Sequence, residues 1–117
     1  MLNQLLLDCQ LDENESFWSR CKSMTWLDGA HNGGHNTWIT NQKALKGFSE
    51  KVTCLIDVRL TPYQIEDRRR PWIAQEEEVF STTLKQILGP DRFTRKVYFN
   101  DQKASLVNHF KVIDTLF

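Results

Sequence analysis

The sequence predicts an α/β fold, a three-stranded parallel sheet with flanking helices. Helical and extended hydrophobic patterns alternate along the chain, and that alternation favours parallel strands joined by right-handed crossovers. The chain has 117 residues, which limits it to one domain, and 40% of them are hydrophobic, which is enough for a modest core. We therefore expect a single folded unit rather than a disordered chain.

Three segments have the character of strands. Residues 23–27 (SMTWL) form a short buried strand that ends at Asp28-Gly29, and residues 93–99 (FTRKVYF) alternate in hydrophobicity. The clearest strand is predicted at residues 51–59, before Thr61-Pro62. There, one face carries Val52, Cys54, Ile56 and Val58, and the other carries Thr53, Leu55, Asp57 and Arg59.

Helices are predicted between and around these strands. Residues 1–9 carry a leucine stripe at helical spacing, a short helix starts at Thr40 or Asn41, and residues 71–88 form a helix with Pro71 first and Gly89-Pro90 after it. A final helix is expected over residues 105–116. Because the chain begins inside the first helical pattern, and three strands leave open edges, we expect residues 1–117 to be the C-terminal part of one larger domain.

Composition argues against some classes of protein. Lysine plus arginine number 15, and so do aspartate plus glutamate, a balance that argues against a nucleic-acid-binding protein. Cys9, Cys21 and Cys54 form no CxxC pair, so they predict neither a zinc knuckle nor a disulfide framework, and they fit a reducing compartment. No apolar run approaches the ~20 residues of a transmembrane helix, and residues 1–10 lack the basic start of a signal peptide.

Two aspartates and a histidine follow the predicted strands. Asp28 closes the first strand, Asp67 lies in the loop after the second, and His109 follows the third. Sites in open parallel sheets form outside the carboxyl ends of the strands. A carboxylate that orients an imidazole there would support general-base catalysis. The plainer interpretation is that the aspartates are turn or cap residues and that the histidine is structural.

The glycine-rich segment 28–38 must be a loop, and it allows other hypotheses. Asp28, His31 and His35 are possible metal ligands, although the glycines between the histidines disfavour the helix on which they would share a face. The glycine N–H groups could instead cradle a phosphate or carboxylate, but the spacing matches neither a P-loop nor a dinucleotide fingerprint. A tight turn in which Asp28 bonds backbone amides is the plainer interpretation, so we predict no metal and no cofactor.

An arginine run lies in the charged loop before the long helix. Arg68, Arg69 and Arg70, beside Trp72, could clamp an anion. The alternative is a solvated loop whose charge is balanced by the neighbouring acidic residues Glu66, Asp67 and those at 76–78.

Three stretches together resemble a known family. WLDGAHNGGHNTWIT, LTPYQIEDRRRPWI and ASLVNHFKV are similar, in order and spacing, to the C-terminal half of a mitochondrial family of serine-hydrolase-like proteins named for open reading frame sixty-nine of chromosome two. MLNQLLL resembles the helix that follows that family's nucleophile elbow. The sequence departs from the family pattern at Ala30, His35 and Arg68.

The resemblance implies an α/β-hydrolase-like fold and a location in the mitochondrial matrix. The triad of that fold runs nucleophile, acid, histidine along the chain, which places the histidine at His109 and the acid at Asp67, with Asp28 as second choice. The resemblance implies a serine esterase or lipase acting on an unidentified ester. None of the chain's serines lies on a glycine-flanked elbow: Ser16, Ser19, Ser23, Ser49, Ser81 and Ser105.

Without a nucleophile, the chain as given is expected to be inactive. The alternative hypothesis is a non-catalytic interaction protein that uses a hydrolase scaffold to bind a protein partner, because one fold can host many functions.

Overall fold

The computed structural model describes residues 20–29 and 35–117. The helix predicted over residues 1–9 lies outside them. The elements of the described part follow one another as β1 (Ser23–Leu27), α3 (Gln42–Lys51), β2 (Leu55–Leu60), α4 (Pro62–Ile65), α5 (Pro71–Leu88), β3 (Phe93–Val97), α6 (Leu106–Lys111) and the 3₁₀ helix η1 (Val112–Leu116).

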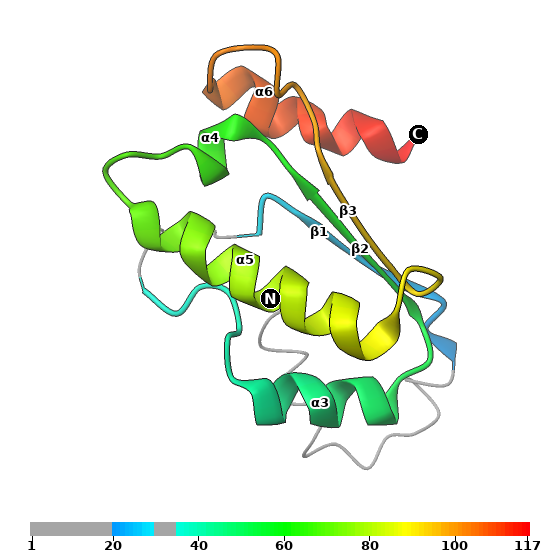
Figure 1. The fold of residues 1–117 in the computed structure, drawn as a ribbon. Coiled ribbons are helices and arrows are strands. Elements are labelled where there is room, and N and C mark those ends of the chain that lie inside the picture. The colour runs from blue at the N-terminus through cyan, green and yellow to red at the C-terminus, as the bar shows by residue number, and fades with distance from the viewer. Residues whose placement is uncertain (1–19, 30–34) are drawn as a thin grey trace.

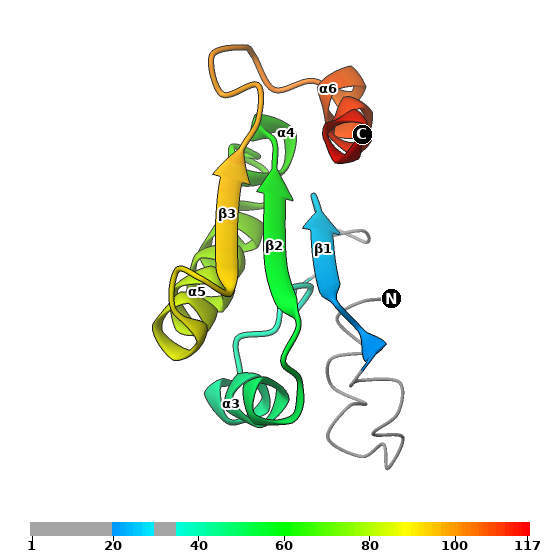
Figure 2. The same cartoon turned by 90° about the vertical axis from the view of Figure 1, so that its right-hand side faces the viewer.

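The sheet is parallel throughout, as the sequence predicts. Its strand order is β1-β2-β3, and Figure 2 shows the three strands side by side and pointing the same way. Trp26 lies opposite Val58 in the first pair, and Val58 lies opposite Arg95 in the second. This register brings the carboxyl ends of all three strands to one edge of the sheet.

Helices α3 and α5 cover one face of this sheet (Figure 1). Trp26 of β1 contacts Phe80 of α5, with 5.4 Å between the ring centroids, and Trp38 contacts the same ring at 5.0 Å. All three side chains are buried. Aromatic rings in such tilted pairs contribute large buried areas, so this face holds the core.

The ends of these helices follow their sequence signals. The side chain of Asn41 accepts a hydrogen bond from the Ala44 N–H at 3.0 Å and caps α3. Pro71 is the first residue of α5, and Gly89, with φ of 80°, follows its last turn. A positive φ of this size suits glycine, which explains why α5 stops where predicted.

Three boundaries differ from the sequence-based prediction. The strand predicted at 51–59 starts only at Leu55, because α3 continues to Lys51 and the Val52 N–H still bonds the Phe48 carbonyl at 3.0 Å. The third strand ends at Val97, shortly before Phe99, which has a positive φ. The final helix is in two parts, α6 and η1.

The C-terminal elements lie beyond the ends of the strands and are held to the sheet by Arg59 (Figure 1). Arg59, on β2, donates to the carbonyl and hydroxyl oxygens of Thr115 in η1, the latter at 2.9 Å. Asp57 pairs with the same guanidinium at 2.6 Å. This contact fixes η1, and with it α6, against the sheet.

Candidate functional site

An acid, a hydroxyl and an imidazole meet at the carboxyl edge of the sheet. Asp28 follows β1 directly, Thr61 follows β2, and His109 lies in α6, the helix after β3. Each side chain therefore comes from the segment that follows a different strand of the parallel sheet. Such an edge is where open α/β sheets place their sites.

The central contact joins Asp28 to His109. The imidazole Nδ1 lies 2.7 Å from the Oδ2 atom of Asp28, a distance typical of a charge-assisted hydrogen bond. The carboxylate accepts only, so Nδ1 carries the proton of this bond and Nε2 is left for another partner. The His109 side chain is 22% exposed, whereas the Asp28 side chain is fully buried. The imidazole can thus be reached from outside while its partner cannot.

Thr61 completes the surroundings of the Asp28 carboxylate. Its backbone N–H donates to Oδ1 at 2.7 Å, and its hydroxyl donates to Oδ2. Thr61 is also the N-cap residue of α4, yet its side chain makes no capping bond there, because the hydroxyl is bonded to Asp28. The sequence indicates Thr61 only as the end of a strand, before Pro62. Its position beside Asp28 follows from the register of neighbouring strands, which sequence alone did not supply.

The backbone at Asp28 is unusual and helps to aim its side chain. Its φ is 41°, in the left-handed region, where aspartate is tolerated better than most residues. The Asp28 N–H still bonds the Arg59 carbonyl at 2.9 Å. Glycine suits the next position, since a Cβ at Gly29 would lie 3.0 Å from the Trp26 ring and 3.2 Å from the Trp38 ring, and these buried rings would have to shift.

Burial shifts the proton affinity of Asp28. Loss of solvent raises the pKa of this carboxyl above its ordinary value of 3.8, against the opposing effect of the Thr61 and His109 hydrogen bonds. A shifted pKa in a carboxyl that holds an imidazole is common at functional sites.

Two aromatic rings flank the imidazole. Tyr63 of α4 lies 4.9 Å from His109 between ring centroids, and Phe110 lies 5.0 Å from it. The Asp28 carboxylate, bonded to Nδ1, sets the orientation of the imidazole between them.

Asp67, our first choice for the acid, lies elsewhere. Its carboxylate pairs with the Arg70 guanidinium at 2.7 Å and accepts the Arg69 N–H at 2.9 Å. Burial acts to raise the pKa of Asp67, but the bonds from Arg70 and Arg69 outweigh it and lower the pKa below its ordinary value. The structure pairs His109 with Asp28, the second choice. Asp67 is favoured by the usual order of strands and loops in the α/β-hydrolase-like fold that the resemblance implies. That order does not determine which carboxyl group reaches the imidazole.

The metal hypothesis involved residues that are only partly described. Asp28 is bonded to Thr61 and His109, and His35 stacks on Trp72 with 4.2 Å between ring centroids. His31 lies outside the described residues. Over residues 20–29 and 35–117, no three potential ligands gather as a metal site would require.

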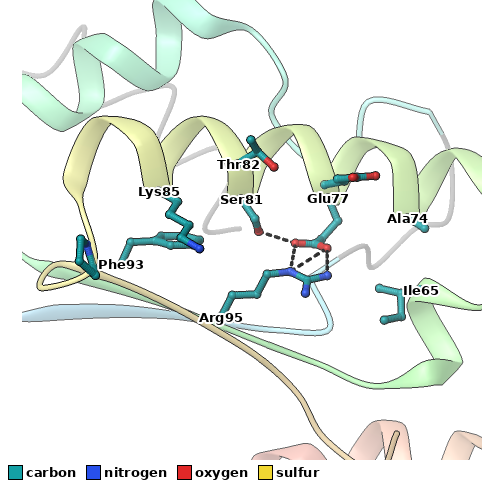
Figure 3. A pocket seen from close by; sticks show the side chains of 10 residues that line it. Ile65, Ala74, Glu77, Ser81, Thr82, Lys85, Phe93 and Arg95 are labelled. Carbon is teal, nitrogen blue, oxygen red and sulfur yellow. Dashed lines mark hydrogen bonds and ion pairs between the residues drawn. The ribbon is translucent and has the colours of Figure 1, made fainter.

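A separate hollow of about 690 Å³ lies along α5 and β3 (Figure 3). Its lining includes the buried Glu77, paired with Arg95, together with Ser81, but neither Asp28 nor His109. Glu77, Arg95 and Ser81 bond one another, so this hollow offers no counterpart of the Asp28–His109 pair.

Comparison with known proteins decides the family. A family model described as C2orf69 matches residues 1–88, which is well over half of the chain. This chain belongs to the C2orf69 family.

Curated members of the C2orf69 family are similar over nearly the whole chain. "Mitochondrial protein C2orf69" of Homo sapiens is 37% identical over 96% of this chain, and its Mus musculus homolog is 36% identical over 96%. The Danio rerio homolog is 38% identical over 86% of the chain. The chain spans only 29% of the human protein's length and 31% of the mouse protein's. No solved structure matches the chain.

Two further findings describe this member of the C2orf69 family. Within the described residues, no helix has both the length and the apolar character that a membrane crossing needs. The serines there lie in β1, α3, α5 and at the start of α6: Ser23, Ser49, Ser81 and Ser105. Ser81 donates to Glu77, and Ser105 caps α6 by accepting the Asn108 N–H at 3.1 Å.

Proposed function

We propose that this chain supplies the acid and the histidine of a serine hydrolase of the esterase or lipase type, within the longer proteins of the C2orf69 family. The observation that carries the proposal is the 2.7 Å contact between Asp28 Oδ2 and His109 Nδ1 at the carboxyl edge of a parallel sheet. The buried carboxylate would hold the imidazole in one tautomer. Nε2 of the partly exposed imidazole would then take the proton of a serine hydroxyl as that oxygen attacks an ester carbonyl.

The sheet leaves a place for the strand that would carry that serine. The strand order puts β1, which bears Asp28, at one edge of the described sheet. In our proposal, the nucleophile strand pairs with this edge and the helix predicted at residues 1–9 connects it to β1. The elbow would then face His109 from the side of β1, the arrangement that the resemblance implies.

The proposal concerns the full-length protein, because this chain spans about three tenths of its relatives. A water-excluded oxyanion site and a nucleophile supply most of the rate in such enzymes, and both would come from outside residues 1–117. Action on an ester in the mitochondrial matrix belongs to the same proposal. The word "mitochondrial" in the names of the relatives supports the organelle.

The test uses a full-length family member and a fluorophosphonate probe, which labels activated serines. We expect substitution at the position of His109 by alanine to abolish labelling. At the position of Asp28, asparagine should slow labelling about a thousandfold or more, since it favours the wrong imidazole tautomer. Asparagine at the position of Asp67 should leave the rate within about threefold, because Asp67 pairs with Arg70.

Lys46→Ala, a change at an exposed residue of α3, is the matched control for folding and probe access. A folded full-length protein that takes no probe would overturn the hydrolase proposal. Loss of labelling in the Asp67 variant but not in the Asp28 variant would overturn the assignment of the acid.

One observation favours a second candidate, a non-catalytic protein that binds a partner. The C-terminal helices expose large apolar side chains to solvent: Leu106, Val107, Phe110, Ile113, Leu116 and Phe117. Exposed apolar patches often mark protein interfaces. The absence of labelling in a well-folded full-length protein would favour this candidate.

A further inference from the structure

A second hollow lies beside the Asp28–His109 pair. It has a volume of about 550 Å³ and is lined by Tyr63, Glu66, Asp67, Arg68, Arg69, Arg70 and Ala104. Tyr63 connects it to the candidate site, because the same ring lies 4.9 Å from the His109 imidazole. A ligand in this hollow would therefore contact Tyr63, whose ring packs in turn against the imidazole that the proposed function uses.

The charges of this hollow are only partly compensated. Asp67 is engaged by Arg70, with 2.7 Å between Oδ2 and the guanidinium. The side chains of Arg68 and Arg69 are exposed and make no ion pair with any residue in the described part of the chain. Two guanidinium groups thus remain available at the rim, against the single carboxylate of Glu66.

The backbone adds to the positive potential. Helix α5, 18 residues long, starts at Pro71 directly after the arginine run and has no acidic residue in its first turn. The N-terminal end of a helix carries a partial positive charge, which attracts anions. Asp67 also accepts the Arg69 N–H at 2.9 Å, a local bond that shapes the turn carrying Arg68 and Arg69.

We propose that this hollow binds an anionic group of the substrate, a carboxylate or a phosphate, through Arg68 and Arg69. Guanidinium groups match both anions with paired N–H donors. The inference rests on the proposed function and narrows it: the substrate is an ester that also carries an anionic group. It also assigns a role to Arg68 and Arg69, which take no part in the Asp28–His109 contact.

The test compares esters of equal length on a full-length family member. Para-nitrophenyl valerate is neutral, the para-nitrophenyl monoester of glutaric acid carries a carboxylate, and an analogue with a terminal phosphate distinguishes the two anions. We expect Arg68→Ala/Arg69→Ala to raise KM for the preferred anionic ester about tenfold. The same variant should leave KM for the neutral ester unchanged. Arg68→Lys/Arg69→Lys should raise KM less, because lysine keeps the charge without the paired donors.

Lys43→Ala/Lys46→Ala is the matched control, since it removes two exposed positive charges from α3 rather than from the hollow. This variant should behave as the unchanged protein does on all three esters. Equal KM values for neutral and anionic esters in an active protein, or an anion preference that the Arg68/Arg69 variant keeps, would overturn the subsite.

A full-length protein that is not labelled by the fluorophosphonate probe and hydrolyses none of the esters would refute the proposed function. Anion binding by Arg68 and Arg69 can still be tested in that case. In that case, inorganic phosphate is titrated into the full-length protein and its Arg68→Ala/Arg69→Ala variant by calorimetry. Binding weakened about tenfold in the variant would support the anion site without catalysis. Absent binding, or equal binding to both proteins, would overturn it.

Discussion

The residue that determines this site is Asp28. Its side chain is fully buried, its backbone has a positive φ of 41°, and it holds Thr61 and His109 together. A non-glycine residue in this region costs about 1–3 kcal/mol, and such costs are typical of functional positions. A buried carboxylate adds a desolvation cost of its own. The backbone conformation and the buried charge of Asp28 therefore both lower the free energy of unfolding.

That cost gives a prediction about pH. The pKa of Asp28 is raised in the folded state, so its contribution to stability is fully present below the unfolded value of 3.8 and is lost as pH rises through the folded value. Asparagine cannot ionise, yet its amide can still accept the Thr61 N–H. We therefore expect Asp28→Asn to be at least as stable as the unchanged protein at pH 8. Thermal melts from pH 4 to pH 8 measure both proteins.

The stability advantage of Asp28→Asn over the unchanged protein should shrink as pH falls from 8 to 4, because protonation of Asp28 in the unchanged protein removes the desolvation cost of its carboxylate. A variant that melts several degrees lower than the unchanged protein at pH 8 would contradict this prediction. It would show that the hydrogen bonds to the ionised carboxylate outweigh its desolvation.

At the scale of elements, α5 is joined to β3 by a buried ion pair (Figure 3). Glu77 of α5 is 1% exposed, and its carboxylate accepts three hydrogen bonds from the Arg95 guanidinium, at 2.5, 3.0 and 3.2 Å, and one from the Ser81 hydroxyl. These bonds raise the pKa of Arg95. The pair holds the long helix in register with the edge strand, and so positions the loop that leads into α5.

The two halves of this pair should differ in their effect on stability. Arg95→Met leaves the Glu77 carboxylate buried with only Ser81 as donor, which should cost about 2 kcal/mol of unfolding free energy. Glu77→Met removes the buried charge itself, and the Arg95 side chain, 37% exposed, can reach water. We expect its cost to be about half as large. Urea unfolding measures both variants.

Lys43→Met, at an exposed residue of α3, is the control for removing an exposed positive charge. It should change the unfolding free energy by less than about 0.5 kcal/mol. A Glu77 variant that loses more stability than the Arg95 variant would contradict the assignment of the desolvation cost to the carboxylate.

At the scale of the whole molecule, the apolar surface of α6 and η1 is the main liability. Val107 is 63% exposed and Phe110 is 65% exposed, and Ile113 continues the same helical stretch. Large contiguous apolar patches on a monomer favour association. Residues 1–117 expressed alone should therefore bind a hydrophobic dye and self-associate.

Light scattering after size exclusion measures that association. Val107→Glu/Ile113→Lys should shift the chain toward monomer, whereas Ile87→Lys, at a 41% exposed residue of α5, should not. A monomeric profile and a sharp cooperative melt for the unchanged chain would contradict the prediction.

Much of this fold could be predicted from local sequence. The strand at 23–27 and the helix at 71–88 have the boundaries that their hydrophobic periods and end signals indicate. The buried face of β2 also follows its alternation. The predicted start of the second strand was wrong, because α3 extends to Lys51 and β2 starts only at Leu55. Alternation of hydrophobic residues alone does not show where a preceding helix ends.

By itself, the sequence determined the α/β class, the parallel sheet and the candidacy of Asp28 and His109 at its carboxyl edge. Only the tertiary structure decided that Asp28, rather than Asp67, contacts His109, and that Thr61 joins them. The reason is physical. Hydrophobic periods and caps are local, but which of two carboxyls reaches an imidazole 81 residues away depends on strand register, the positive φ at Asp28 and the packing of α6.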